Sequence, residues 1–143
     1  MNFNITKLRP FGLLIEPVPG KEDIRNIDIN ELKKALSDEH LLALRGFHSF
    51  DTATDFSNYC ETFGEISVWP FGKVLELIEH DNPKDHIFDN SYIPLHWDGM
   101  YREQVPETQV FHCVSAPGSN NGGGTTFVNT KQVLEKTKKE TLE

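Results

Sequence analysis

The sequence of 143 residues has few cysteines, no long hydrophobic run and no signal-peptide pattern at its start. Its two cysteines, Cys60 and Cys113, form no CxxC pair, so no disulfide framework is expected. No apolar run approaches the roughly 20 residues that a membrane-spanning helix needs. We therefore expect a protein of the reducing cytoplasm, with no membrane association.

Basic residues are also scarce. The chain has 14 Lys and Arg against 22 Asp and Glu, which gives a net charge of −8. Nucleic-acid binding needs a basic face, so a nucleic-acid partner is not expected. Aromatic residues make up 10% of the chain. With this length, they predict one folded domain over residues 1–143 with a real core.

The first half of the chain alternates between strand-like and helix-like segments. The first predicted helix has Asp28 as N-cap, Glu31 three residues later, and a buried stripe of Leu32, Ala35 and Leu36. The second has Asp51 as the expected cap and closes at Gly64. The predicted elements are strands at 11–18 and 41–47, the latter buried, and helices at 28–40 and 51–64.

The second half is predicted to be mostly strands, with one late helix capped by Asn129 or Thr130. Strands are expected at 73–80, 108–117 and 125–128, a polar loop at 81–94 and the helix at 129–143. Helices that gather early and are followed by strands favour an α+β fold with a barrel or double sheet.

The segment SYIPLHWDGMYRE, residues 91–103, places a histidine and an aspartate two residues apart. In a strand, His96 and Asp98 would present an imidazole and a carboxylate on one side. Two histidines and one carboxylate are the usual ligands of non-haem Fe(II) in oxygenases. The alternative is a surface histidine with a nearby aspartate in a loop after Pro94, because H-x-D is common by chance.

Two other motifs carry no chemistry of their own. His112 and Cys113 are neighbours in a predicted strand and would face opposite sides, so Cys113 is expected to be a buried structural residue. The glycine-rich run NNGGGTT lacks the pattern of a phosphate loop or a dinucleotide site. It is interpreted as a tight turn.

Four ordered elements resemble the TauD/TfdA-like Fe(II)/2-oxoglutarate-dependent dioxygenase superfamily. The H-x-D of LHWDGMY is one of them, and the region around it is most similar to the PvcB-like branch, which is linked to isonitrile and pyoverdine or paerucumarin biosynthesis. The other three are Arg45-Gly46-Phe47, Phe63-Gly64 and the G-G-x-T-x-F pattern in GGGTTFVNT.

The resemblance implies roles for individual residues. His96 and Asp98 match the first two iron ligands, and Thr125 matches the threonine that binds 2-oxoglutarate, with Thr126 as the alternative. The implied substrate is a small molecule, such as an isonitrile derived from an aromatic amino acid, that is hydroxylated or desaturated with dioxygen. Candidate substrate-contacting residues are Tyr92, Trp97, Met100 and Tyr101.

The family pattern is incomplete in this sequence. The second iron-binding histidine and the arginine that pairs with 2-oxoglutarate do not follow the G-G-x-T element, and His112 is no substitute. We therefore expect the N-terminal part of a jelly roll of the clavaminate synthase type, a partial double-stranded β-helix with helices packed on the sheet. Such a chain is predicted to be inactive by itself and to pair with a second copy through open sheet edges.

Two other functions fit the same residues. A degenerate half-domain could bind a partner or dimerise without catalysis, which predicts a stable dimer with no affinity for iron. A cupin-like metal isomerase or hydrolase would also use H-x-D, but it predicts no response to 2-oxoglutarate.

Overall fold

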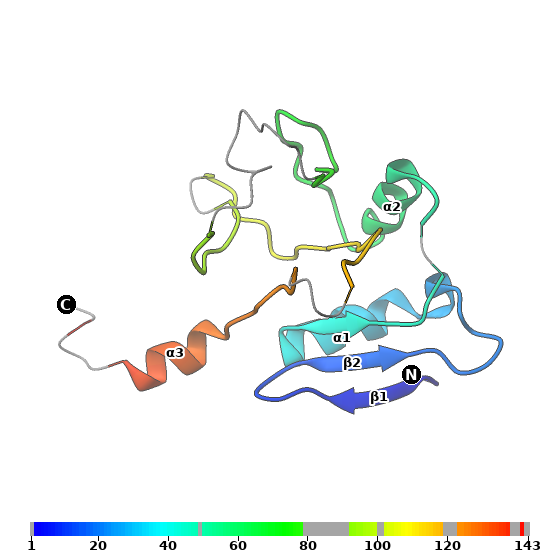
Figure 1. The fold of residues 1–143 in the computed structure, drawn as a ribbon, viewed down its shortest axis with the longest axis horizontal. Helices are drawn as coiled ribbons and strands as arrows, with labels where there is room; N and C mark the ends of the chain where they lie inside the picture. Colours follow the sequence, from blue (N-terminus) through cyan, green and yellow to red (C-terminus); the bar gives the residue numbers. More distant parts are fainter. Residues whose placement is uncertain are drawn as a thin grey trace. The chain divides into compact units, whose positions relative to one another are not determined.

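The computed structural model divides into two compact units, Met1–Phe63 with Val128–Glu143, and Gly64–Phe127 (Figure 1). A single domain over residues 1–143 stays a prediction. In the part of the chain that is described, no helix is long and apolar enough to cross a membrane. The structure describes residues 2–48, 50–78, 92–99, 102–118, 123–137 and 141.

The first unit contains a sheet of three strands in the order β1-β2-β3. β2 (Leu13–Glu16) and β3 (Leu42–Leu44) lie inside the two predicted strands and pair in parallel. β1 (Asn4–Lys7) was not predicted, and it pairs antiparallel with β2. β3 was expected to be buried but is only half-buried, because it forms an edge of this sheet.

The connection from β2 to β3 carries a short 3-10 helix, η1 (Ile24–Asn26), and the helix α1 (Ile29–Glu39). Both the extent and the cap of α1 confirm the prediction. The Asp28 side chain accepts hydrogen bonds from the backbone N–H groups of Asn30 and Glu31 at 2.8 and 3.2 Å. These bonds satisfy two of the amides that a helix start leaves without partners.

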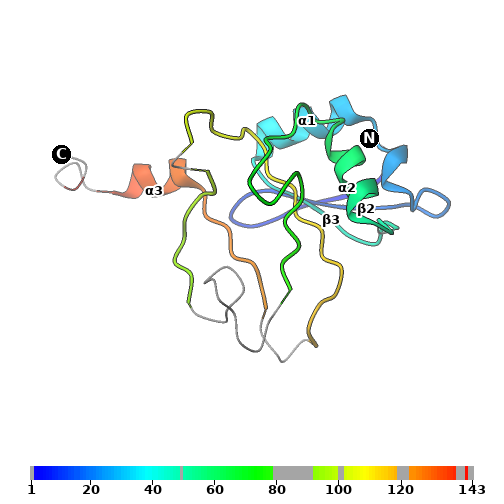
Figure 2. The same ribbon diagram turned by 90° about the horizontal axis from the view of Figure 1, so that it is seen from above.

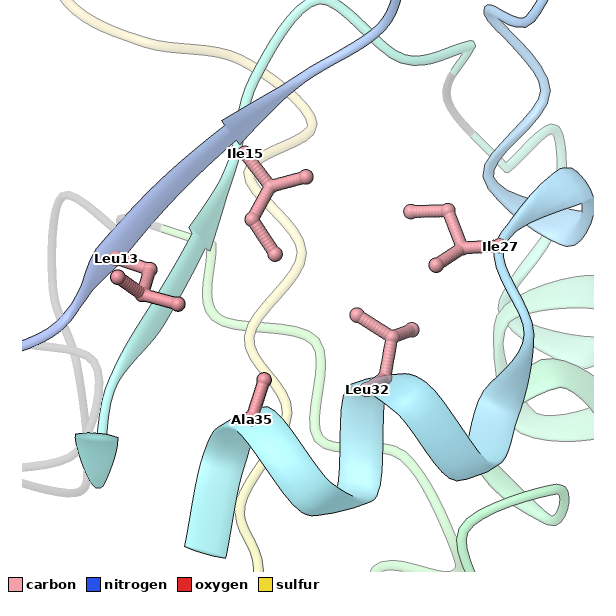
Figure 3. Packing of buried hydrophobic residues seen from close by; sticks show 5 residues of the cluster. All are labelled: Leu13, Ile15, Ile27, Leu32 and Ala35. Atoms are coloured by element: carbon pink, nitrogen blue, oxygen red, sulfur yellow. The ribbon is translucent and has the colours of Figure 1, made fainter. Parts of the chain in front are cut away.

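The core of the first unit lies between the sheet and α1, which covers one face of the strands (Figure 2). Figure 3 shows Leu13 and Ile15 of β2 pointing toward the helix. Leu32 and Ala35 meet them from α1, so two of the three residues of the predicted stripe are buried. Ile15 and Leu32 are the most deeply buried, with 0% and 1% of their surface exposed. The five core residues are Leu13, Ile15, Ile27, Leu32 and Ala35.

The second predicted helix is shorter than expected. α2 (Ala53–Cys60) ends four residues before Gly64. Its N-cap is Thr52 and not Asp51, because the Thr52 hydroxyl accepts a hydrogen bond of 3.0 Å from the backbone N–H of Asp55. A cap needs its side-chain oxygen within reach of the second or third helical amide, and helix start at Ala53 gives Thr52 this position.

The environment of Cys113 differs from the buried one that was expected. Cys113 is exposed, and Cys60 on α2 is partly buried. Burial raises the pKa of the Cys60 thiol from 9.0 to about 11. The thiolate is the reactive form, so at about pH 8 only roughly one Cys60 in a thousand is reactive.

We therefore expect iodoacetamide at about pH 8 to alkylate Cys113 well before Cys60. Peptide mass spectrometry of samples quenched at increasing times measures the two rates. In denaturing urea both thiols should react alike, which is the control for intrinsic reactivity. Equal rates in the native chain would show that α2 does not shield Cys60 in solution.

In the second unit, the predicted strands at 73–80, 108–117 and 125–128 are not formed by the described residues. Among the described residues of this unit, the only ladder pair is an isolated bridge between Trp69 and Gly72. A strand requires a hydrogen-bonded neighbour, and the described residues offer these segments none. Phe111 and Val114 accordingly stay exposed. The jelly-roll part of the prediction is therefore not seen directly, whereas the α+β mixture is.

The last described helix, α3 (Thr130–Lys136), confirms the start of the predicted C-terminal helix. Asn129 is its cap: the side-chain oxygen accepts hydrogen bonds from the backbone N–H groups of Lys131 and Gln132 at 3.0 and 3.4 Å. Of the predicted remainder, residues 138–140 and 142–143 lie outside the described residues.

Candidate metal centre

His96 and Asp98 lie on an irregular segment of the second unit that ends in a turn, and not on the expected strand. The turn is closed by a hydrogen bond of 2.9 Å from the Arg102 N–H to the Gly99 carbonyl. Gly99 is buried and has a φ of +83°, a conformation that residues with a Cβ rarely adopt. A Cβ there would lie 3.0 Å from Cδ of Pro106. This glycine is thus needed directly after Asp98.

The imidazole of His96 is held by the backbone two residues earlier. Its Nδ1 lies 2.8 Å from the carbonyl oxygen of Pro94. A carbonyl oxygen only accepts, so Nδ1 must carry the proton and donate it. In the neutral ring the lone pair is then on Nε2, which is the tautomer that a metal-binding histidine takes when its other nitrogen donates to a carbonyl.

The other ring nitrogen of His96, Nε2, faces one oxygen of Asp98. Nε2 and Oδ1 are 3.1 Å apart. In the neutral ring these two atoms are both acceptors and repel unless a cation lies between them. Two ligands about 2.1 Å from one divalent ion and at about 90° are about 3.0 Å apart. The pair therefore has the donor types and the separation that suit two adjacent ligands of one ion.

A proton is the other cation that this pair can take. The hydrogen bond to Pro94 raises the pKa of His96 above its ordinary value of 6.5, and the charge and hydrogen bond of Asp98 raise it further. Both side chains are about half-exposed, at 48% and 49%. Protons and metal ions therefore compete for the same position in an accessible site.

Gln109 is a site residue that the sequence did not reveal. Its Nε2 donates a hydrogen bond of 2.9 Å to Oδ2 of Asp98, the oxygen that does not face His96. The two residues are eleven positions apart. Gln109 lies in a segment interpreted as a strand, and no short motif connects it to Asp98, so only the folded chain shows the contact.

Among the described residues, no hydrogen bond joins another predicted site residue to the pair. Thr125 and Thr126 are exposed, and within the described residues neither forms a hydrogen bond with His96 or Asp98. Tyr92 and Trp97 are 88% and 48% exposed. Met100 and Tyr101 lie outside the described residues.

In the described ranges, no group of three His, Cys, Asp or Glu side chains could hold a metal ion. Among the described residues, His96 and Asp98 are therefore a pair without a third such side chain. A separate open pocket of about 560 Å³ lies in the first unit, where Arg25, Asp55 and Tyr59 are among the lining residues. It contains none of the predicted site residues.

Comparison with known proteins identifies the family of the chain. Residues 4–143 match the profile of the family described as "Taurine catabolism dioxygenase TauD, TfdA family". The chain belongs to the TauD/TfdA family. This match favours the dioxygenase interpretation of the four sequence elements over the cupin-like alternative.

Within this family, the chain is similar to tyrosine isonitrile desaturases. It is 52% identical over 125 residues to that of Pseudomonas aeruginosa, covering 87% of this chain and 43% of the relative. It is 50% identical over 124 residues to the tyrosine isonitrile desaturase of Erwinia amylovora, and this match covers 87% of this chain and 42% of the relative.

A solved structure gives the same relationship. It is of PvcB, described as an Fe, alpha-ketoglutarate dependent oxygenase from an isonitrile synthetic pathway. The TM-score is 0.70 at 49% identity, and the match covers 81% of this chain and 44% of that chain. The TauD/TfdA chain thus spans less than half the length of these relatives.

Proposed function

We propose that this chain carries the first two iron ligands of an Fe(II)- and 2-oxoglutarate-dependent oxygenase that desaturates an isonitrile derived from tyrosine. The observation that carries the proposal is the approach of His96 Nε2 to Asp98 Oδ1 at 3.1 Å, with Nδ1 held by Pro94. The names of the two desaturases support the reaction and the substrate class, and the description of PvcB supports the cofactors.

The candidate site residues have defined parts in this proposal. His96 and Asp98 hold the ion, and Thr125, or else Thr126, binds 2-oxoglutarate. Fe(II) with 2-oxoglutarate and dioxygen, when bound, supplies the oxidising power that removes hydrogen from the substrate. The aromatic side chains of Tyr92 and Trp97 stay proposed contacts for a small aromatic substrate, as do Met100 and Tyr101. The fold proposed for the domain that carries this site is the jelly roll of the family.

These 143 residues are proposed to be inactive by themselves. Residues 127–143 contain neither histidine nor arginine, the two residue types that the family pattern places after the G-G-x-T element. Two ligands bind an ion less tightly than three, so the chain should take Fe(II) weakly.

The test is an anaerobic titration of the purified chain with Fe(II), followed by NMR. We expect paramagnetic broadening to start at the signals of His96 and Asp98. Unchanged signals of both residues at millimolar Fe(II) would refute the proposed site. Addition of 2-oxoglutarate, dioxygen and substrate should yield no succinate. Succinate formed in step with substrate loss would instead disprove inactivity of the chain by itself.

A second hypothesis is a non-catalytic module that binds a partner or a second copy of the chain. It is favoured by the large apolar side chains that the second unit leaves exposed, among them Leu95 at 61%, Phe111 at 62% and Val114 at 85%. Sedimentation velocity distinguishes the hypotheses when combined with the Fe(II) titration. A stable dimer that leaves Fe(II) unbound supports the module, and a metal-binding chain supports the oxygenase.

A further inference from the structure

The two oxygens of Asp98 have different partners. Oδ2 accepts the hydrogen bond of 2.9 Å from Gln109 Nε2, and Oδ1 lies 3.1 Å from His96 Nε2. A carboxylate only accepts hydrogen bonds, so Gln109 must present its NH₂ group and not its carbonyl oxygen. Oδ1, which faces His96, is therefore the oxygen placed to share a cation with the histidine.

The chain between these two residues is held at its start. The carbonyl of Gly99 accepts the hydrogen bond from the N–H of Arg102, and Pro106 packs where a Cβ on Gly99 would lie. The guanidinium of Arg102 lies 4.6 Å from the centre of the Trp69 ring, within the range of a cation–π contact. These contacts and the bond from Gln109 to Asp98 all lie within the second unit.

We propose that Gln109 is a positioning residue that makes Asp98 bind its ion through Oδ1 alone. A carboxylate can bind a divalent ion through one oxygen or through both. The hydrogen bond to Oδ2 fixes the rotation of the carboxylate and directs Oδ1 to the side of His96. This inference rests on the proposed function, because it takes His96 and Asp98 to be the metal-binding pair.

An amide suits this position for electrostatic reasons. It carries no charge, so it orients Asp98 without cancelling the negative charge that attracts the metal ion, as a lysine or arginine would. Binding through one oxygen also leaves one more position on the ion for other ligands. Partners of this kind, which touch a ligand and not the metal, typically change metal affinity by about 10- to 100-fold when mutated.

The test uses Co(II) as the probe and the variant Gln109→Met, which keeps the length of the side chain and loses the donor. We expect a Kd for Co(II) about 10- to 100-fold higher than in the wild-type chain. The Co(II) spectrum should also change, because a carboxylate free to bind through both oxygens alters the coordination geometry. Gln104→Met is the matched control: Gln104 is an exposed glutamine five positions earlier, and its loss should change neither quantity.

A second readout needs no metal. In the metal-free chain, the side-chain NH₂ signals of Gln109 should shift in the variant Asp98→Asn. Unshifted NH₂ signals, or a Kd and spectrum of Gln109→Met equal to those of the wild type, overturn the positioning role and leave the metal site standing. A wild-type chain that binds no Co(II) refutes the metal site, and the role of Gln109 with it.

Discussion

Replacement of His96 by alanine is expected to reduce the affinity of the chain for Fe(II) or Co(II) by more than about 100-fold. Mutation of residues that only touch a metal ligand typically costs about 10- to 100-fold, so loss of a ligand itself should cost more. His96→Ala removes Nε2, and Asp98 then has only its own oxygens to offer. Isothermal titration of the wild-type and variant chains under anaerobic conditions measures the change.

The matched control for this variant is His48→Ala. His48 is an exposed histidine of the first unit, and its backbone N–H donates to the carbonyl of Glu22, a bond that alanine retains. We expect this variant to bind the metal as the wild type does. If both variants lose affinity equally, the ion binds nonspecifically to histidines and the paired site is wrong.

The pH dependence of metal binding gives the His96→Ala variant a second readout. The pKa of His96 is raised, first by Pro94 and then by Asp98, so the imidazolium persists to a higher pH than for an ordinary histidine. The proton must leave before the metal binds, and the affinity should therefore fall as the pH decreases through this raised pKa. His96→Ala should lack this part of the pH dependence. Titrations at a series of pH values compare the two chains.

Replacement of Leu32 by alanine is expected to lower the free energy of unfolding of the first unit by about 3 kcal/mol. Leu32 is 1% exposed and packs from α1 against Leu13 and Ile15 of β2 (Figure 3). The variant loses the transfer free energy of the missing carbon atoms and leaves a cavity under the helix. Urea unfolding followed by far-UV circular dichroism measures the change.

Two further variants make this result interpretable. Leu134→Ala removes the same atoms from α3, where Leu134 is 55% exposed, and should change the stability by less than about 0.5 kcal/mol. Leu32→Met keeps most of the volume and should cost less than about 1.5 kcal/mol, which gives a measurable variant if Leu32→Ala unfolds. Similar losses for Leu32→Ala and Leu134→Ala would be incompatible with a core between α1 and the sheet.

The features that the sequence predicted well are those that depend on residues close along the chain. The Asp28 cap and the Leu32 and Ala35 stripe of α1 follow from hydrogen bonds and side-chain spacing within a few residues. His96 and Asp98 were expected to face one side because they would share a strand. The structure brings the two side chains together on an irregular segment instead, so they do face each other, the assumed strand was wrong, and their binding of a metal stays a prediction.

The sequence by itself determined the family, the α1 helix with its cap, and the H-x-D motif, because motifs and helical periodicity are local. Tertiary structure decided which apolar segments become strands, since a strand depends on a hydrogen-bonded neighbour distant in sequence. Thus β1 finds β2, whereas residues 108–117 find no partner among the described residues. Tertiary structure also decided the orientation of Asp98, because its contact with Gln109 forms only when a chain of eleven positions returns on itself.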